Sequence, residues 1–134
     1  MRPIAPVGTL TLETWNRLRS HIQDGIAQLG GTHTESDLLQ LLEQGRLTMW
    51  AGDDSFVFTE VNSYPRSREI RIFLAGGNWA EIEEMEPRIC GLGRLYDCRY
   101  AVTIGRPGFE RRGDYKNHGY KLVGSVYRKD LNHG

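Results

Sequence analysis

The 134-residue sequence predicts a single α/β domain, spanning residues 1–134, in which helices flank a mixed but mainly antiparallel β-sheet. Three observations predict this class. From Leu47 onward, apolar residues alternate with others in successive short runs, which is the period of a β-strand. One such run stops at the pair Gly76-Gly77, and a helical pattern begins directly after it. A further strand pattern follows that helix, and a strand–helix–strand order implies a parallel crossover.

The first third of the sequence predicts two helices. Residues 1–10 hold two prolines and a glycine, which indicate an irregular lead-in. A helix is expected from Thr11, with apolar residues at spacings of three and four, up to the glycine pair at 30–31. A second helix is expected to begin near Ser36, whose hydroxyl can cap it, and to end at Gly45. Its leucines cover a wide arc, which indicates a well-buried helix.

Three strands of an antiparallel meander are expected next. Residues 47–51 and 55–61 alternate on either side of a turn at 52–54 and predict a β-hairpin. The proline and arginines of residues 64–68 indicate an exposed turn into a third strand. In that third strand, three aliphatic residues alternate with three others: Ile70, Ile72 and Leu74 against Glu69, Arg71 and Phe73.

A long helix is predicted from Asn78, a good N-cap, to Leu92. Pro87 lies inside this pattern and is expected to kink or split the helix. After it the sequence predicts, in order, a strand at 98–104, a turn into a short helix at 105–112, a terminal strand at 119–129 and a frayed tail at 130–134.

The composition narrows the classes of partner. The chain has 17 basic and 17 acidic side chains, so no global field draws it to nucleic acid or to an anionic membrane. The absence of a long apolar run and of an apolar signal region predicts a soluble intracellular protein. Cys90 and Cys98 are expected to be reduced, structural thiols. The four histidines lack metal-ligand spacing, so no metal is expected.

The junction between the third strand and the long helix is the first candidate site. A strand, a small-residue turn and a helix N-terminus leave backbone N–H groups pointing outward with partial positive charge, which can form an anion cradle. The alternative is that Gly76 and Gly77 only make a tight connection. Both interpretations stay open at this point.

A second candidate is the locally basic stretch from Arg106 to Lys121. Three aromatic residues are interleaved with its basic ones, a pattern that can hold a nucleotide or a phosphate. Glu110 and Asp114 interrupt the stretch, however, and favour a solvated loop. Nucleic acid is therefore not the expected partner.

The order of elements, with a glycine turn between the third strand and the long helix, resembles the GNAT acetyltransferase superfamily. The resemblance covers residues 36–131 and is closest to small GNAT-like proteins of phages and prophages. In those proteins, as here, a Leu-rich helix ends at a glycine before the first hairpin, and the motif Gly105–Arg111 precedes a terminal strand that begins Gly119-Tyr120-Lys121.

The resemblance implies that acetyl-CoA is the cofactor and that its pyrophosphate lies at the start of the long helix. The residues that match the family's pyrophosphate loop are Leu74, Ala75, Gly76, Gly77, Asn78 and Trp79. The glycines of the loop are present, whereas the family's basic residue is absent and the loop is shorter. Arg71 and Arg106 are the nearby alternatives for positive charge.

The resemblance also suggests catalytic residues. Acetyl transfer to an amine needs a base for the amine and an acid for the leaving thiolate. Glu60, near the end of the second strand, is the candidate base, and Glu69 is a weaker one. Tyr115 is the candidate acid. The alternatives are an exposed strand-end carboxylate and a surface tyrosine.

The sequence thus predicts a phage- or prophage-type N-acetyltransferase that transfers acetyl from acetyl-CoA to an amine on an unidentified small molecule or protein. The alternative is a non-catalytic GNAT-shaped binding or assembly protein, with a phage or host protein as its partner. The expected location is the cytoplasm of the bacterial host or the virion. The edge strands at 47–51 and at the C-terminus offer a surface for a second copy of the chain.

Overall fold

The computed structural model describes residues 6–105 and 114–132. The chain divides into two compact units: a main unit, Met1–Ile104, and a C-terminal unit, Gly105–Gly134. Each is described by itself.

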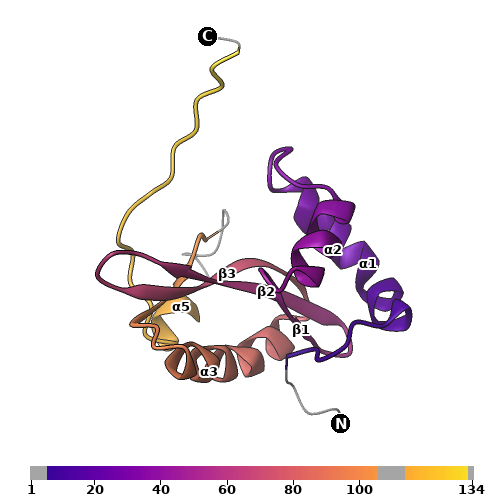
Figure 1. Ribbon diagram of the computed structural model, residues 1–134, viewed down its shortest axis with the longest axis horizontal. Coiled ribbons are helices and arrows are strands. Elements are labelled where there is room, and N and C mark those ends of the chain that lie inside the picture. The colour runs from indigo at the N-terminus through magenta and orange to yellow at the C-terminus, as the bar shows by residue number, and fades with distance from the viewer. Residues whose placement is uncertain (1–5, 106–113, 133–134) are drawn as a thin grey trace. The chain divides into compact units, whose positions relative to one another are not determined.

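The main unit is built on a four-stranded sheet in the order β1-β2-β3-β4. The two contacts β1–β2 and β2–β3 are antiparallel, and β3–β4 is parallel. Helices α1 and α2 lie on one side of the sheet and α3 lies on the other (Figure 1). The predicted mixed sheet, meander and parallel crossover are therefore confirmed. The elements of the main unit are α1 (Leu12–Ala27), α2 (Glu35–Glu43), β1 (Thr48–Ala51), β2 (Ser55–Ser63), β3 (Arg68–Gly77), α3 (Trp79–Leu95) and β4 (Tyr100–Thr103).

The start of α1 is as predicted, because the Thr11 hydroxyl accepts from the Thr14 N–H as an N-cap. The predicted cap of α2 is wrong. Thr34 is the cap, and it exchanges hydrogen bonds with Asp37 in a capping box. The residue three after Thr34 is Asp37, a carboxylate, whereas the residue three after Ser36 is a leucine, which cannot bond back.

The prediction that α2 is well buried is also wrong. Leu38 is its only fully buried residue, and Leu39 is 37% exposed. Helix α3 is continuous through Pro87, so the split that was the alternative to a kink does not occur. Asn78 caps α3 as predicted, since its side chain accepts from the Glu81 N–H.

Two hydrophobic cores lie on opposite faces of the sheet. The first joins α1 and α2 to the sheet and is formed by Trp15, Leu18, Ile22, Leu38, Leu47, Met49, Phe56, Phe58 and Leu74. The second joins α3 to the sheet and is formed by Trp50, Val57, Ile70, Met85 and Ile89. Each fully buried side chain of this kind stabilises the fold by roughly 1.5–3 kcal/mol. Consecutive residues of β2 thus alternate between the two cores.

Strand β3 does not keep a simple alternation, because it contains a β-bulge at Phe73. Phe58 pairs with Leu74 and Thr59 pairs with Ile72, so Phe73 is the extra residue. Ile70 and Ile72 consequently pack in the second core, while Leu74 packs in the first. The unbroken alternation expected over this strand is therefore wrong.

The C-terminal unit contains one short helix among its described residues, α5 (Asp114–Asn117). The predicted terminal strand at 119–129 is wrong, because these residues pair with no strand and have no regular structure. Alternation alone does not make a strand, since its backbone groups need a neighbour to bond. Leu122, Val123, Val126 and Tyr127 are accordingly exposed. The short helix expected at 105–112 falls almost entirely outside the described residues.

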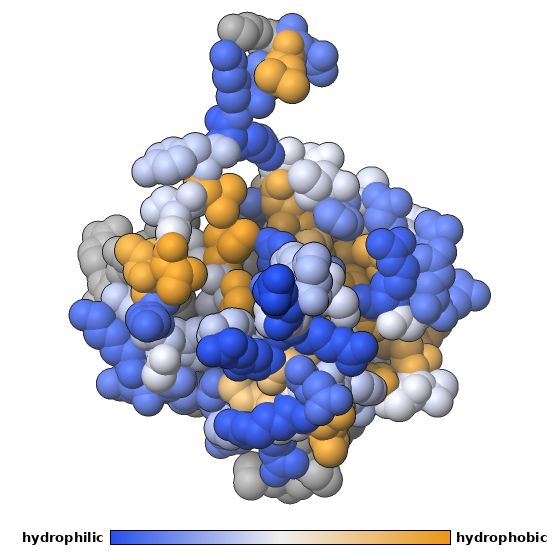
Figure 2. Space-filling model, turned by 60° about the vertical axis from the view of Figure 1, so that its left-hand side comes forward, coloured by the Kyte–Doolittle hydropathy of each residue, from blue (hydrophilic) through white to orange (hydrophobic). Residues whose placement is uncertain are grey.

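Hydrophilic and hydrophobic side chains are interspersed over the face shown in Figure 2. Among the described residues, no helix combines the length and apolar character that crossing a bilayer would require.

Candidate functional site

Strand β3 is longer than its parallel neighbour β4, and we call its stretch Phe73–Gly77 the β3–β4 opening. Strand β4 pairs with Glu69–Ile72 of β3, whereas β3 itself continues to Gly77. The part of β3 from Phe73 to Gly77 therefore runs past the end of its parallel neighbour.

The bulge at Phe73 lies where this opening begins. A bulge turns the strand and redirects the side chains beside it. The Phe73 ring meets the ring of His33, from the α1–α2 connection, edge-on at a centroid distance of 5.0 Å. The connection between α1 and α2 therefore contacts the same stretch of β3.

The glycine pair joins this opening to α3. Gly77 has a φ of +97°, and a Cβ there would overlap the carbonyl oxygen of Asp54. A Cβ on Gly76 would lie 2.9 Å from the ring of Phe56. The Asn78 N–H donates to the Asp54 carbonyl at 2.8 Å. Gly77 is thus needed for close packing on the β1–β2 turn, and Gly76 for close packing on Phe56 of β2.

A carboxylate occupies the first turn of α3. The Glu81 side chain accepts hydrogen bonds from the Asp54 N–H at 3.0 Å and from the buried Ser55 hydroxyl. It binds α3 to the β1–β2 turn. Its negative charge opposes an anion at the same helix start, because charges within the first turn act directly on the groups there. The sequence placed Glu81 in this turn but did not show this contact.

Helix α1 contacts the same β1–β2 turn. Arg17 donates to the carbonyls of Gly52 at 3.1 Å and Asp53 at 3.2 Å. His21 Nε2 lies 2.7 Å from a carboxylate oxygen of Asp54. The nearest guanidinium to this turn is therefore already bonded to backbone carbonyls.

Glu60 lies on β2 directly opposite Arg71 of β3. The closest ion-pair distance between them, Arg71 Nη1 to Glu60 Oε1, is 3.8 Å. The next pair along the ladder on this face is Asn62 and Glu69, and the amide of Asn62 donates to the Glu69 carboxylate at 3.3 Å. Tyr64 lies beside them, and partial desolvation raises the pKa of its hydroxyl, with a further rise from Glu69.

We call this group the polar face: Glu60, Asn62, Tyr64, Glu69 and Arg71. Its strand residues are on the α1/α2 side of the sheet, because their neighbours Thr59, Ile70 and Ile72 are directed toward the second core. The sequence singled out Glu60 and Glu69 but not their association with Tyr64.

The remaining candidate, Tyr115, belongs to α5, where Lys116 Nζ lies 5.8 Å from the centre of its ring. Tyr115 is in the C-terminal unit, whereas Glu60 is in the main unit. The six residues predicted to bind the cofactor all lie at the junction of β3 and α3. Leu74–Gly77 end β3, Asn78 caps α3 and Trp79 begins it.

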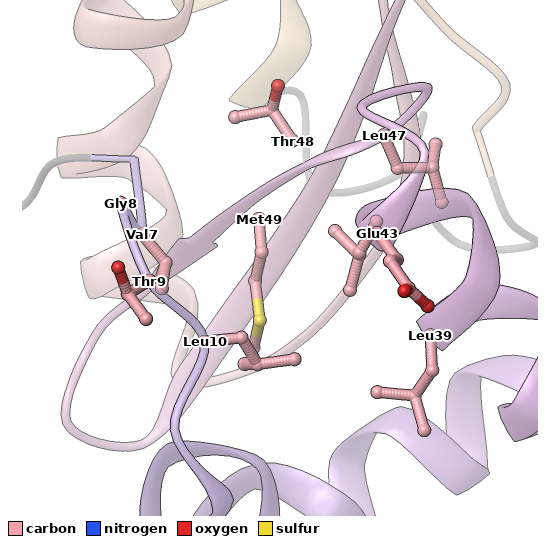
Figure 3. Close-up of a pocket in the computed structure, with 10 residues that line it drawn as sticks. Val7, Gly8, Thr9, Leu10, Leu39, Glu43, Leu47, Thr48 and Met49 are labelled. Atoms are coloured by element: carbon pink, nitrogen blue, oxygen red, sulfur yellow. The ribbon is translucent and has the colours of Figure 1, made fainter.

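A separate pocket of about 530 Å³ opens beside β1, at the other edge of the sheet (Figure 3). It lies between the lead-in, α2 and β1, and it is lined by Val7, Gly8, Thr9, Leu10, Leu39, Leu42, Glu43, Leu47, Thr48 and Met49. Strand β2 stands between β1 and β3, so this pocket is distinct from the β3–β4 opening.

Both cysteines are free thiols in the structure. Cys90 donates to the Glu86 carboxylate at 2.9 Å, and burial raises the pKa of the Cys98 thiol. Within residues 6–105 and 114–132, no three His, Cys, Asp or Glu side chains are grouped so as to hold a metal ion.

No protein-family model matches the chain, and no curated protein sequence matches it. Solved structures do. The aminoglycoside N-acetyltransferase AAC(6')-Iy in complex with CoA is similar over 96% of this chain and 100% of its own, with 16% identity and a TM-score of 0.65. A predicted acetyltransferase from Clostridium acetobutylicum, solved with acetyl-CoA, is similar over 98% and 99%, with 10% identity and a TM-score of 0.67.

An acetyltransferase of Trypanosoma brucei is similar over 96% of this chain and 99% of its own, with 10% identity and a TM-score of 0.60. These likenesses extend over nearly the whole of each chain. The protein therefore has the GNAT acetyltransferase fold, as its order of elements suggested.

Proposed function

We propose that the protein is an acetyl-CoA-dependent N-acetyltransferase. The observation that carries the proposal is that β3 continues past its pairing with β4 and leads directly into the start of α3. An extended arm with amide groups can lie along such an edge, and a phosphate can lie at the helix start that follows it. The similar structures from AAC(6')-Iy and C. acetobutylicum contain CoA and acetyl-CoA, which supports the proposal.

The two halves of this opening fit CoA unequally. The edge of β3 beyond Ile72 suits the pantetheine arm. The start of α3 suits the pyrophosphate less well, because the Asn78 N–H is bonded to Asp54 and the Glu81 carboxylate lies in the first turn. We therefore expect binding in the micromolar range, which corresponds to about 8 kcal/mol.

Acetyl-CoA supplies an activated thioester. In the proposed reaction, Glu60 takes the proton of the acceptor ammonium, directly or through one water, so that the free amine can attack. The N–C bond forms and the C–S bond breaks. The departing thiolate takes a proton from Tyr115, the only acid that the resemblance suggests, and the surplus proton of the nitrogen restores Tyr115 through solvent. The products are the N-acetyl amine and CoA.

The helix start can be tested at Ala80, because this residue is exposed in the first turn of α3. Ala80→Lys adds a positive charge where a pyrophosphate would lie, and Ala80→Glu adds a negative one. We expect calorimetric titration with CoA to show tighter binding for Ala80→Lys and weaker binding for Ala80→Glu, by about three- to tenfold each way at low salt. Ala80→Gln is the neutral control.

Equal affinity of all three variants for CoA would show that the pyrophosphate does not lie at the start of α3. Gly77 is unsuitable for this test, because its substitution disturbs the packing on Asp54 whether or not CoA binds.

A second candidate is a non-catalytic GNAT-shaped binding or assembly protein. The Glu81 carboxylate at the helix start favours it, since that charge weakens a phosphate site. The same titration separates the two functions, because this candidate requires no binding heat at millimolar CoA. The phage or prophage type of the protein, and its place in a host cytoplasm or a virion, are supported by the resemblance alone.

A further inference from the structure

Arg71 has too few partners for its place in the sheet. Its side chain is 32% exposed, and its Nε atom is buried with no hydrogen-bond partner in the described part of the chain. Its ion pair with Glu60 spans 3.8 Å, which exceeds a hydrogen bond. A buried donor left unpaired is costly and is rare in folded proteins. The Arg71 Nε–H is therefore a buried donor that no acceptor among the described residues of the main unit bonds.

The polar face carries both signs of charge close together. Glu60 and Glu69 supply carboxylates, and Arg71 supplies a guanidinium directly opposite Glu60 in the strand register. Because the Glu60–Arg71 pair is loose, a ligand can bond to either member without breaking a hydrogen bond between them. A ligand with an ammonium and a carboxylate a few ångströms apart would satisfy both.

This face lies next to the proposed acetyl site. Arg71 is the second-last residue of β3 that pairs with β4, and Phe73, two residues later, begins the opening. Two residues of strand span roughly 7 Å. An amine held beside Glu60 is thus within one small molecule's length of a thioester at the opening.

We propose that the acceptor is a free amino acid or a close analogue, whose carboxylate is bound by Arg71 and whose ammonium is bound by Glu60. This inference rests on the proposed function. A guanidinium binds a carboxylate through two parallel hydrogen bonds, and Arg71 Nε with Nη supplies that pair of donors. Glu60 takes one proton of the bound ammonium, the free amine forms the N–C bond as the C–S bond of the thioester breaks, and the departing thiolate takes up the second proton of the nitrogen to give CoA.

The first experiment measures binding without acetyl-CoA. The probes are a panel of free L-amino acids and the matching amino-acid amides, which keep the ammonium and lack the carboxylate. The readout is the NMR signal of the Arg71 Nε–H group in the full chain. We expect at least one free amino acid to shift this signal and its amide to leave it in place. Weak substrates have KM values of about 1 mM. The inference would be overturned if no free amino acid shifts the signal at about 10 mM.

The second experiment measures acetyl transfer from acetyl-CoA to the same panel. We expect kcat/KM for the preferred acid to exceed that for its amide by roughly 10- to 100-fold, the range for a hydrogen bond between charged groups. Arg71→Gln should bring the ratio of the two kcat/KM values close to one. Arg66→Gln, which removes an exposed arginine from the β2–β3 turn, is the matched control and should change neither rate.

Amides that react as well as acids would overturn the inference even if transfer occurs. If CoA does not bind and the Arg71 signal still responds to a free acid, the proposed function fails and the amino-acid site stands. The two failures are therefore distinguishable.

Discussion

Replacing Gly77 by alanine should destabilise the main unit strongly. An L-residue at a φ of +97° is strained by roughly 1–2 kcal/mol. The new methyl group would also overlap the Asp54 carbonyl, which accepts the Asn78 N–H, so β3 or the β1–β2 turn must move. Overpacking of this kind costs about 1–3 kcal/mol. Together these effects lower the free energy of unfolding by about 2–5 kcal/mol, a large part of the 5–15 kcal/mol typical of a domain.

Urea denaturation followed by circular dichroism measures this change. With a typical slope of about 1–3 kcal/mol per molar urea, the midpoint should fall by about 1–3 M. Gly91→Ala is the control, because Gly91 lies inside α3 with nothing within 4 Å of an added Cβ. It should stabilise the protein by about 0.5–1 kcal/mol, since alanine is the better helix former. An unchanged urea midpoint in Gly77→Ala would refute the packing argument. The glycine pair would then be explained by ligand binding alone.

Two further predictions concern the capping box of α2. Thr34→Ala should lower the free energy of unfolding by about 1 kcal/mol in thermal denaturation, whereas Ser36→Ala, at the position where the sequence suggested the cap, should have a much smaller effect. The Thr34 backbone N–H and hydroxyl lower the pKa of Asp37 below its ordinary value of 3.8, so the stability that this carboxylate contributes is present above that pH and is lost as the pH falls below it. Asp37→Asn should weaken the acid dependence of the unfolding midpoint, and an acid limb identical to the parent's would contradict this.

The sequence predicted those elements whose cause is local. The period of two, the cap at Asn78 and the glycine stop at 76–77 are each set by a few adjacent residues, and the structure has them in place. The cap of α2 was missed by two residues, because two hydroxyl residues compete there and only Thr34 has a carboxylate at the right spacing.

The missed features depend on contacts between distant residues. Glu81 bonds Asp54 across 27 residues of sequence, and no pattern within either segment indicates that pair. The terminal stretch at 119–129 alternates like a strand but has no neighbouring strand to bond in the described structure. The polar face was only partly predicted for the same reason, since Glu60 stood out as a strand-end carboxylate while its pairing with Arg71 required the register of β2 on β3.

The bulge at Phe73 shifts the alternation of β3, so that even-numbered residues face one side of the sheet before it and the other side after it. Before the bulge, Ile70 and Ile72 pack in the core between the sheet and α3. After the bulge, Leu74 packs in the core between the sheet and α1. Deleting Phe73 alone would make Leu74 follow Ile72 directly, so a regular alternation would keep Leu74 on the face toward α1. The pairing of β3 with β2 should therefore survive the loss of Phe73, whereas its ring contact with His33 would be lost. Deleting Ile72 instead would remove a residue of the core against α3, so among variants a deletion at Phe73 should be better tolerated than one at Ile72.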